Sequence, residues 1–259
     1  MTTSITQENK KNRISSAALK IAAVLFWFTV WYAASALLGS ELLLPSPLST
    51  LRKLFELAGE ADFWLAALWS LLRITAGCAA GIVCGTLLGA VTAFSRVLYE
   101  LFKPVLTVVR ATPVASFIIL ALVWIKRDNI STFISFLMVL PILWSNVTEG
   151  IAQCDSDLLE MARAFHFSKT ALISKIYIPS VMPYFFAGCT TAIGLSWKAG
   201  VAAEVLSLPK HALGSELYYS KIYLETPSLF AVTLVVIVMS IILEKLLGLA
   251  LKKIAGKAV

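Results

Sequence analysis

Long stretches without charged residues alternate with short polar segments along this chain of 259 residues. Charge-free stretches cover Ile21–Ser40, Ile74–Ser95, Ile130–Thr148, Ile176–Trp197 and Thr226–Leu243, and Pro104–Ile125 is interrupted only by Arg110. At a rise of about 1.5 Å per residue, each is long enough, or nearly so, to cross a hydrocarbon layer of about 30 Å as a helix. The pattern predicts an all-α integral membrane protein with six transmembrane helices.

The composition supports this prediction, and the charges give the spans an orientation. Hydrophobic residues make up 59% of the chain and charged residues 14%, with a mean hydropathy of +0.84, whereas about 25% of a soluble domain is charged. With the N-terminus inside, the inner segments 1–20, 94–103, 150–180 and 244–259 hold 13 Lys and Arg, and the outer segments hold 6. This excess predicts a protein of the cytoplasmic membrane with both termini in the cytoplasm. Residues 1–15 are expected to form a disordered cytoplasmic tail, and 16–259 a single transmembrane domain.

The sequence contains no recognisable catalytic constellation. The two histidines, His166 and His211, lie far apart, and no GxxxxGKS/T phosphate-binding loop occurs. The four cysteines are scattered, without the spacing of a zinc site or a disulfide framework. We therefore expect no enzymatic activity, no metal site, no cofactor and no nucleic-acid partner for this chain.

The second span carries a glycine at every fourth position, namely Gly77, Gly81, Gly85 and Gly89. Small residues at this spacing form one stripe along a helix and let the backbone of a neighbouring helix approach closely in lipid. The stripe predicts a helix-packing face.

A polar segment, Asp155–Pro183, separates the fourth and fifth spans. Asp155 or Ser156 can cap a first short helix, on which Leu158, Met161, Ala162 and Phe165 share an apolar face. Ser168 can cap a second short helix, and Pro179 and Pro183 mark the change into the next span. Two amphipathic helices in place of a plain connection indicate a docking device for another protein.

This segment resembles the coupling loop of permease subunits of ABC transporters, in which Glu-Ala-Ala is followed after three residues by Gly and after nine more by Ile-x-Leu-Pro. The matching positions here are Glu160, Ala162, Ile176 and Pro179; Ile178 is a mild variant, and Met161 and His166 depart from the pattern. His166 replaces the glycine of a sharp turn, where a left-handed non-glycine residue costs on the order of 1 kcal/mol. Either the turn is kept at that cost or the loop bends differently.

The resemblance covers about residues 60–250 and is closest to the permeases of nitrate, sulfonate and taurine importers, through Ser70–Gly77, Arg110–Pro113, the coupling loop at 150–180 and Ala199–Glu204. It implies a type I importer permease fold and a subunit that moves a small solute. It also implies a cytoplasmic ATPase dimer that binds ATP and magnesium, a second permease copy forming a homodimer, and an external substrate-binding protein. On this resemblance Glu160, Met161, Ala162, Arg163, His166, Ile176 and Pro179 form the ATPase-coupling site.

Four residues near the ends of the later spans are candidates for the translocation path: Arg110, Trp197, Lys198 and Glu204. Ionisable residues at membrane depth usually face protein or water. We expect Lys198 and Glu204 to help form an outer gate, with Arg110 nearer the inner mouth. The alternative for Arg110 and Lys198 is that their long side chains reach an interface.

A stand-alone transporter driven by an ion gradient is the alternative function. Such carriers usually show internal repeats and buried carboxylates for ion coupling. Here the spans contain no Asp, Glu204 lies near a span end, and no repeat is evident. The importer subunit is therefore the preferred hypothesis.

Overall fold

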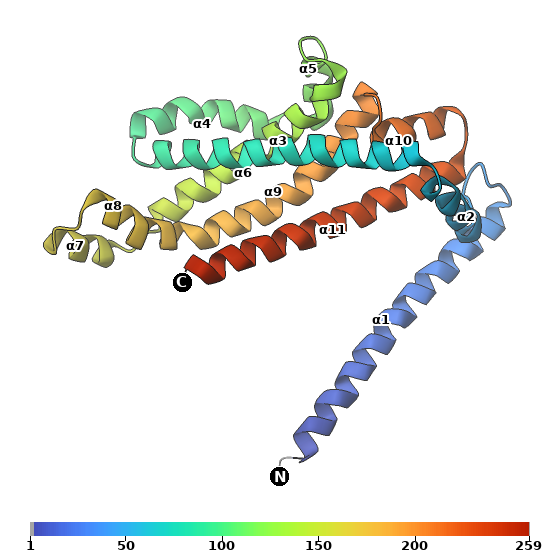
Figure 1. Ribbon diagram of the computed structural model, residues 1–259, viewed down its shortest axis with the longest axis horizontal. Helices are drawn as coiled ribbons and strands as arrows, with labels where there is room; N and C mark the ends of the chain where they lie inside the picture. The colour runs from blue at the N-terminus through green and yellow to red at the C-terminus, as the bar shows by residue number, and fades with distance from the viewer. Residues whose placement is uncertain (1–2, 259) are drawn as a thin grey trace. The chain divides into compact units, whose positions relative to one another are not determined.

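A computed structural model describes the backbone of residues 3–258 and the side chains of residues 18–249 and Lys253. Throughout the described backbone the regular structure is helical. The elements are α1 (Thr3–Leu38), α2 (Pro47–Ala58), α3 (Ala61–Ala93), α4 (Arg96–Ala111), α5 (Val114–Ala121), α6 (Arg127–Ala152), α7 (Ser156–Ala164), α8 (Lys169–Leu172), the π-helical turn η1 (Ile173–Tyr177), α9 (Ile178–Ser207), α10 (Leu213–Ile222) and α11 (Thr226–Ala258) (Figure 1). The all-α fold class is confirmed.

Five helices of the described chain are long and apolar enough to cross a membrane: Ala18–Leu38, Ala61–Ala93, Arg127–Ala152, Lys169–Ser207 and Thr226–Leu249. The third predicted span is broken, because α4 and α5 meet at a bend of 103°. Thr112 is extended, with a ψ of 132°, and Pro113 follows it. A residue before proline is disfavoured in the helical conformation, which ends α4 here. The six predicted spans are present when this bent pair counts as one.

The chain separates into two compact units, residues 1–59 with 219–233 and residues 60–218 with 234–259. In the first unit, the Trp31 indole N–H donates to the carbonyl oxygen of Pro45 at 3.0 Å, and the Trp31 ring stacks on Phe230. Helix α1 already begins at Thr3, so residues 3–15 continue the first helix, and the expectation of a disordered tail is wrong for them. The extent of the permease domain, 16–259, stays a prediction.

In the second unit, α3, α6 and α9 pack together along their lengths (Figure 1). The glycine stripe lies where α3 meets α6. A Cβ atom added to any of the four glycines would collide with α6. At Gly77 it would lie 2.1 Å from the Thr132 carbonyl oxygen, and at Gly81 it would lie 2.7 Å from the Val139 Cβ. At Gly85 it would lie 2.6 Å from the Leu140 carbonyl oxygen, and at Gly89 it would lie 2.9 Å from the Trp144 carbonyl oxygen. Real Cβ atoms essentially never come within 3.0 Å of such atoms. The backbones of α3 and α6 therefore approach so closely only because these side chains are absent.

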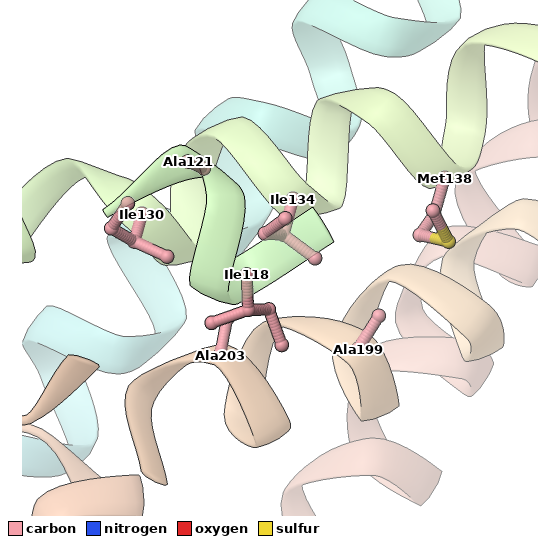
Figure 2. Packing of buried hydrophobic residues seen from close by; sticks show 7 residues of the cluster. All are labelled: Ile118, Ala121, Ile130, Ile134, Met138, Ala199 and Ala203. Carbon is pink, nitrogen blue, oxygen red and sulfur yellow. The ribbon is translucent and has the colours of Figure 1, made fainter. Parts of the chain in front are cut away.

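Helix α5 is fixed by an apolar cluster with α6 and α9, seen in Figure 2. Ile118 and Ala121 of α5 are buried in this cluster, together with Ile130, Ile134 and Met138 of α6 and Ala199 and Ala203 of α9. In lipid, where burial brings little hydrophobic gain, the close van der Waals packing of these side chains holds the arrangement together. The cluster holds α5 against the stretch of α9 that carries Trp197, Lys198 and Glu204.

Candidate coupling and gating sites

Helix α7 forms the first half of the coupling segment (residues 155–179). The Asp155 Oδ1 atom accepts a hydrogen bond from the Asp157 N–H at 2.8 Å and caps the helix. Of the predicted apolar face only Ala162 is buried; Leu158 and Met161 are each 42% exposed and Phe165 is 74% exposed. The predicted helix is therefore present, and most of its apolar face has no cover within this chain.

The turn after α7 keeps the left-handed conformation at His166, whose φ is 54°. The His166 N–H donates to the Arg163 carbonyl at 3.1 Å, and the Phe167 N–H donates to the Ala162 carbonyl at 2.9 Å. These two bonds are the Schellman arrangement, which satisfies the last carbonyls of a helix when the next residue is left-handed. The sharp turn thus exists without the glycine, and the His166 Nδ1 atom lies 3.0 Å from the Arg163 carbonyl oxygen.

The second predicted helix is not separate from the fifth span. Ser168 caps α8 by accepting from the Ala171 N–H at 3.2 Å, as expected. The helix then continues through η1 into α9, so Pro179 and Pro183, which are predicted to mark the change into the fifth span, lie within one continuous helix. The Ile178 N–H donates to the Ile173 carbonyl, five residues earlier, and Pro179 follows with no N–H to donate. The wider π turn accommodates the missing donor of the proline without interrupting the helix.

The remaining coupling residues divide into exposed and buried groups. Glu160, Met161, Arg163, His166 and Pro179 are exposed, and Ile176 is buried. Among the described side chains no ion pair joins Glu160 to Arg163. The Glu160 carboxylate is therefore available to another chain.

Glu204 occupies a fully buried position near the end of α9, with 0% of its surface exposed. Its Oε2 atom accepts from the Ser70 hydroxyl at 2.7 Å and from the Gly214 N–H at 3.3 Å. The same Ser70 oxygen accepts from the Leu213 N–H at 2.9 Å. Leu213 and Gly214 open α10, so the carboxylate lies at the positive end of that helix. The Glu204 Oε1 atom is buried without a hydrogen-bond partner within the chain.

The connection from α9 to α10 contains two strained residues and is held by hydrogen bonds from Arg73, an arrangement called here the Arg73 clamp. Leu208 and His211 have φ values of 51° and 48°, and a left-handed non-glycine residue costs roughly 1–2 kcal/mol. The Arg73 guanidinium donates to the carbonyls of Lys210 and His211 at 3.0 and 3.2 Å. It also lies 3.6 Å from Asp128 Oδ1, which accepts from the Lys210 N–H at 3.3 Å. Strain of this kind persists only where the surroundings hold it in place.

The other gate candidates lie in different environments. Trp197 is 1% exposed, and its indole N–H donates to the Val236 carbonyl of α11 at 3.1 Å. Lys198 is exposed. Arg110 is also exposed; its guanidinium donates to the Pro141 carbonyl and lies 6.0 Å from the Trp144 ring centroid. The structure therefore brings Glu204 together with Ser70 and α10, and it brings neither Lys198 nor Arg110 to that cluster.

The sequence did not single out Ser70, Arg73, Asp128 or Gly214 as site residues. Ser70 is 134 positions from Glu204, and no local pattern links them. An arginine and an aspartate at the same predicted end of neighbouring spans, Arg73 and Asp128, are the one signal that could have suggested the clamp.

These features define a multi-pass helical membrane protein, with the coupling segment at one end of the continuous helix Lys169–Ser207 and a buried polar cluster near its other end. Residues 81–255 match the family of binding-protein-dependent transport system inner membrane components, and the chain belongs to that family. Its members are non-catalytic permease subunits of importers, which favours the importer over the stand-alone transporter.

Three curated relatives show the range of this similarity. The nitrate import permease NrtB of Synechococcus elongatus is 31% identical over 197 residues, covering 72% of this chain and 70% of the relative. The bicarbonate transport permease CmpB of the same species is 27% identical, covering 76% and 74%. The taurine transport permease TauC of Escherichia coli is 25% identical, covering 87% and 84%. The resemblance to nitrate- and taurine-type permeases is thereby confirmed.

Proposed function

We propose that this permease moves a small solute bearing an oxyanion group, such as nitrate, bicarbonate or a sulfonate, into the cytoplasm at the expense of ATP hydrolysed by a separate ATPase. The relatives named for nitrate, bicarbonate and taurine support the solute class. An external binding protein delivers the solute, and two copies of the chain form the pathway. Both termini and the coupling segment face the cytoplasm, in agreement with the excess of Lys and Arg there.

The observation that carries the coupling proposal is the uncovered apolar face of α7. Leu158, Met161 and Phe165 are exposed together on one short helix. Apolar side chains that gather on a polar surface usually mark a contact with another protein. In this proposal the ATPase covers that face, and the free Glu160 carboxylate pairs with it at the rim.

Co-purification with the ATPase tests this proposal. Glu160→Lys, or Ala162→Phe at the buried position of α7, should lower ATPase retention at least several-fold or separate hydrolysis from uptake. Lys20→Glu, a charge reversal of an exposed residue outside the segment, serves as the matched control. Wild-type retention and wild-type coupling in both variants would refute the docking role.

We also propose that the Glu204–Ser70–α10 cluster holds the outer gate in the conformation of this structure. The support is the combination of a buried carboxylate at the start of α10, a strained connection and the Arg73 clamp. Lys198 lies outside this cluster and contributes to the solute path instead.

Uptake at matched expression and matched ATPase binding tests the gate. Glu204→Gln and Ser70→Ala should alter uptake and raise the ATPase rate measured without binding protein, because the gate then opens without its signal. Lys198→Met should lower uptake alone. If none of the three variants changes either rate, the cluster is structural and Lys198 lies outside the path.

A further inference from the structure

Two cavities adjoin at the end of the helical bundle where α3 ends and α9 begins. The larger, of about 540 Å³, has polar groups in its lining, among them Arg96, Tyr99, Thr148 and Glu149. The smaller, of about 400 Å³, is lined by Ala90, Val147, Val181, Met182 and Phe185 with other apolar residues. Phe94, Ile151 and Tyr177 line both, so the two cavities share a wall.

The apolar cavity lies further from the helix ends than the polar cavity, as the hydrocarbon layer of a bilayer lies beneath the headgroup layer. Phe185 and Thr86 lie seven residues inside the ends of α9 and α3, which places the apolar cavity about 10 Å deep along these helices. The polar cavity lies at the helix ends themselves, around Ala93 at the end of α3 and Ala152 at the end of α6. Because α3 has 33 residues and is longer than the hydrocarbon layer, a point about 10 Å from its end lies near the edge of that layer. An apolar cavity there, with a polar cavity on its water-facing side, matches the acyl and headgroup ends of a phospholipid.

The apolar cavity is open to the outside of this chain. Ile173 and Ile178, which line it, are 50% and 48% exposed, and Phe94 at the shared wall is 61% exposed. The Phe94 ring meets Tyr177 edge to face, with centroids 5.2 Å apart. An acyl chain can therefore enter between α3 and η1 from the lipid side.

The charges of the polar cavity select the headgroup. Arg96 supplies a guanidinium, which binds phosphate in a bidentate manner. Glu149 supplies a carboxylate, which accepts from the Gln153 amide at 2.8 Å and makes no ion pair with Arg96 among the described side chains. One charge of each sign complements a headgroup that carries both a phosphate and an ammonium, whereas a purely anionic headgroup meets repulsion from Glu149.

We propose that the joined cavities bind one phospholipid with a zwitterionic headgroup, its phosphate on Arg96, its ammonium on Glu149 and an acyl chain in the apolar cavity. The lipid belongs to the inner leaflet, a point that rests on the proposed orientation. The acyl chain of the lipid would contact Ile173 and Tyr177 of η1, which line the apolar cavity. A bound lipid therefore supports the turn that joins the coupling segment to the fifth span.

Native mass spectrometry of the purified full-length permease tests the proposal independently of any ATPase. After delipidation the wild-type protein is titrated with phosphatidylethanolamine, phosphatidylcholine and phosphatidylglycerol. We expect about tenfold tighter binding of phosphatidylethanolamine than of phosphatidylglycerol, with phosphatidylcholine between them because its ammonium has no N–H. Equal binding of all three lipids would overturn the headgroup assignment.

Paired variants locate the lipid. Ala90→Phe fills the apolar cavity and should reduce lipid binding about tenfold, whereas Val91→Phe, at an exposed neighbouring position, should not. Glu149→Gln should abolish the headgroup preference, and Arg96→Ala should weaken the binding of all three lipids, whereas Arg127→Ala at an exposed arginine on another helix should change neither. If Ala90→Phe leaves lipid binding unchanged and instead weakens self-association or ATPase binding, a protein occupies the cavity and the proposal is wrong.

Discussion

Replacing each stripe glycine by alanine should destabilise the permease in proportion to how closely α6 approaches it. At Gly77 the new Cβ would lie 2.1 Å from the Thr132 carbonyl oxygen, so α3 and α6 must move apart by about 0.9 Å to reach the 3.0 Å limit of real contacts. Overpacking of this kind typically costs about 1–3 kcal/mol. Alanine recovers up to about 1 kcal/mol because it favours a helix more than glycine does.

The net expectation is a loss of about 1–2 kcal/mol at Gly77 and a change of under about 0.5 kcal/mol at Gly89, where the closest contact is 2.9 Å. Gly85 and Gly81, with closest contacts of 2.6 and 2.7 Å, should fall between them. Gly248→Ala is the matched control, since it is the same substitution in a helix and the new Cβ would have nothing within 4 Å.

Steric-trap unfolding in bicelles, or the midpoint of thermal inactivation in detergent, gives the ranking. Gly81→Leu should reduce folded protein strongly, whereas Val83→Leu on the exposed side of α3 should be mild. If Gly77→Ala and Gly248→Ala shift stability by the same amount, close approach at the stripe does not hold α3 to α6 and the reasoning fails.

Three further substitutions test other parts of the second unit. His166→Gly should raise stability by on the order of 1 kcal/mol in the thermal assay, since glycine adopts a φ of 54° without strain; a lower midpoint would show that the imidazole contact with Arg163 matters more. Gly214→Ala should lower the midpoint and disturb uptake, because its Cβ would lie 2.4 Å from the Glu204 Cβ; unchanged values would contradict the packing of α10 on α9. Partial burial, with Glu60 and Asp62 as further causes, raises the pKa of Glu216 above its usual 4.5; because the residue is exposed and its charge is screened by solvent, stability should fall only slightly as the pH rises through and above that value. Glu216→Gln should then raise the thermal midpoint slightly at pH 7 and leave it unchanged near pH 4, and equal shifts at both pH values would rule out this carboxyl.

The spans and the two helices of the coupling segment could be predicted because their signals are local. Charge-free runs locate the membrane helices, and the spacing of Asp155, Ser168 and the apolar residues locates α7 and α8. The residues Arg110–Pro113 indicate where the third span changes direction. The angle of 103° could not be predicted, because it depends on Ile118 and Ala121 packing against helices that come later in the chain.

The polar cluster could not be predicted for a related reason. The partners of Glu204 are a hydroxyl 134 positions earlier and a backbone N–H beyond a loop with two left-handed residues. Nothing in the neighbourhood of Glu204 distinguishes a buried carboxylate from one that faces water. Pro179 and Pro183 indicate a change into the next span by a local signal, and the π turn just before Pro179 explains why the helix continues through it.

The continuous helix from Lys169 to Ser207 can transmit a change in tilt from one end of the second unit to the other. Its 39 residues make a rod of about 58 Å. The coupling segment lies at one end of this rod and Glu204 lies near the other. If such a rod tilts by about 5° about one end, simple geometry moves the opposite end by about 5 Å, nearly one turn of a helix. In the proposed coupling role, a change of about 5° in the tilt of this helix at the coupling segment would therefore move Glu204 far enough to break its hydrogen bonds with Ser70 and the start of α10, with no intermediate relay.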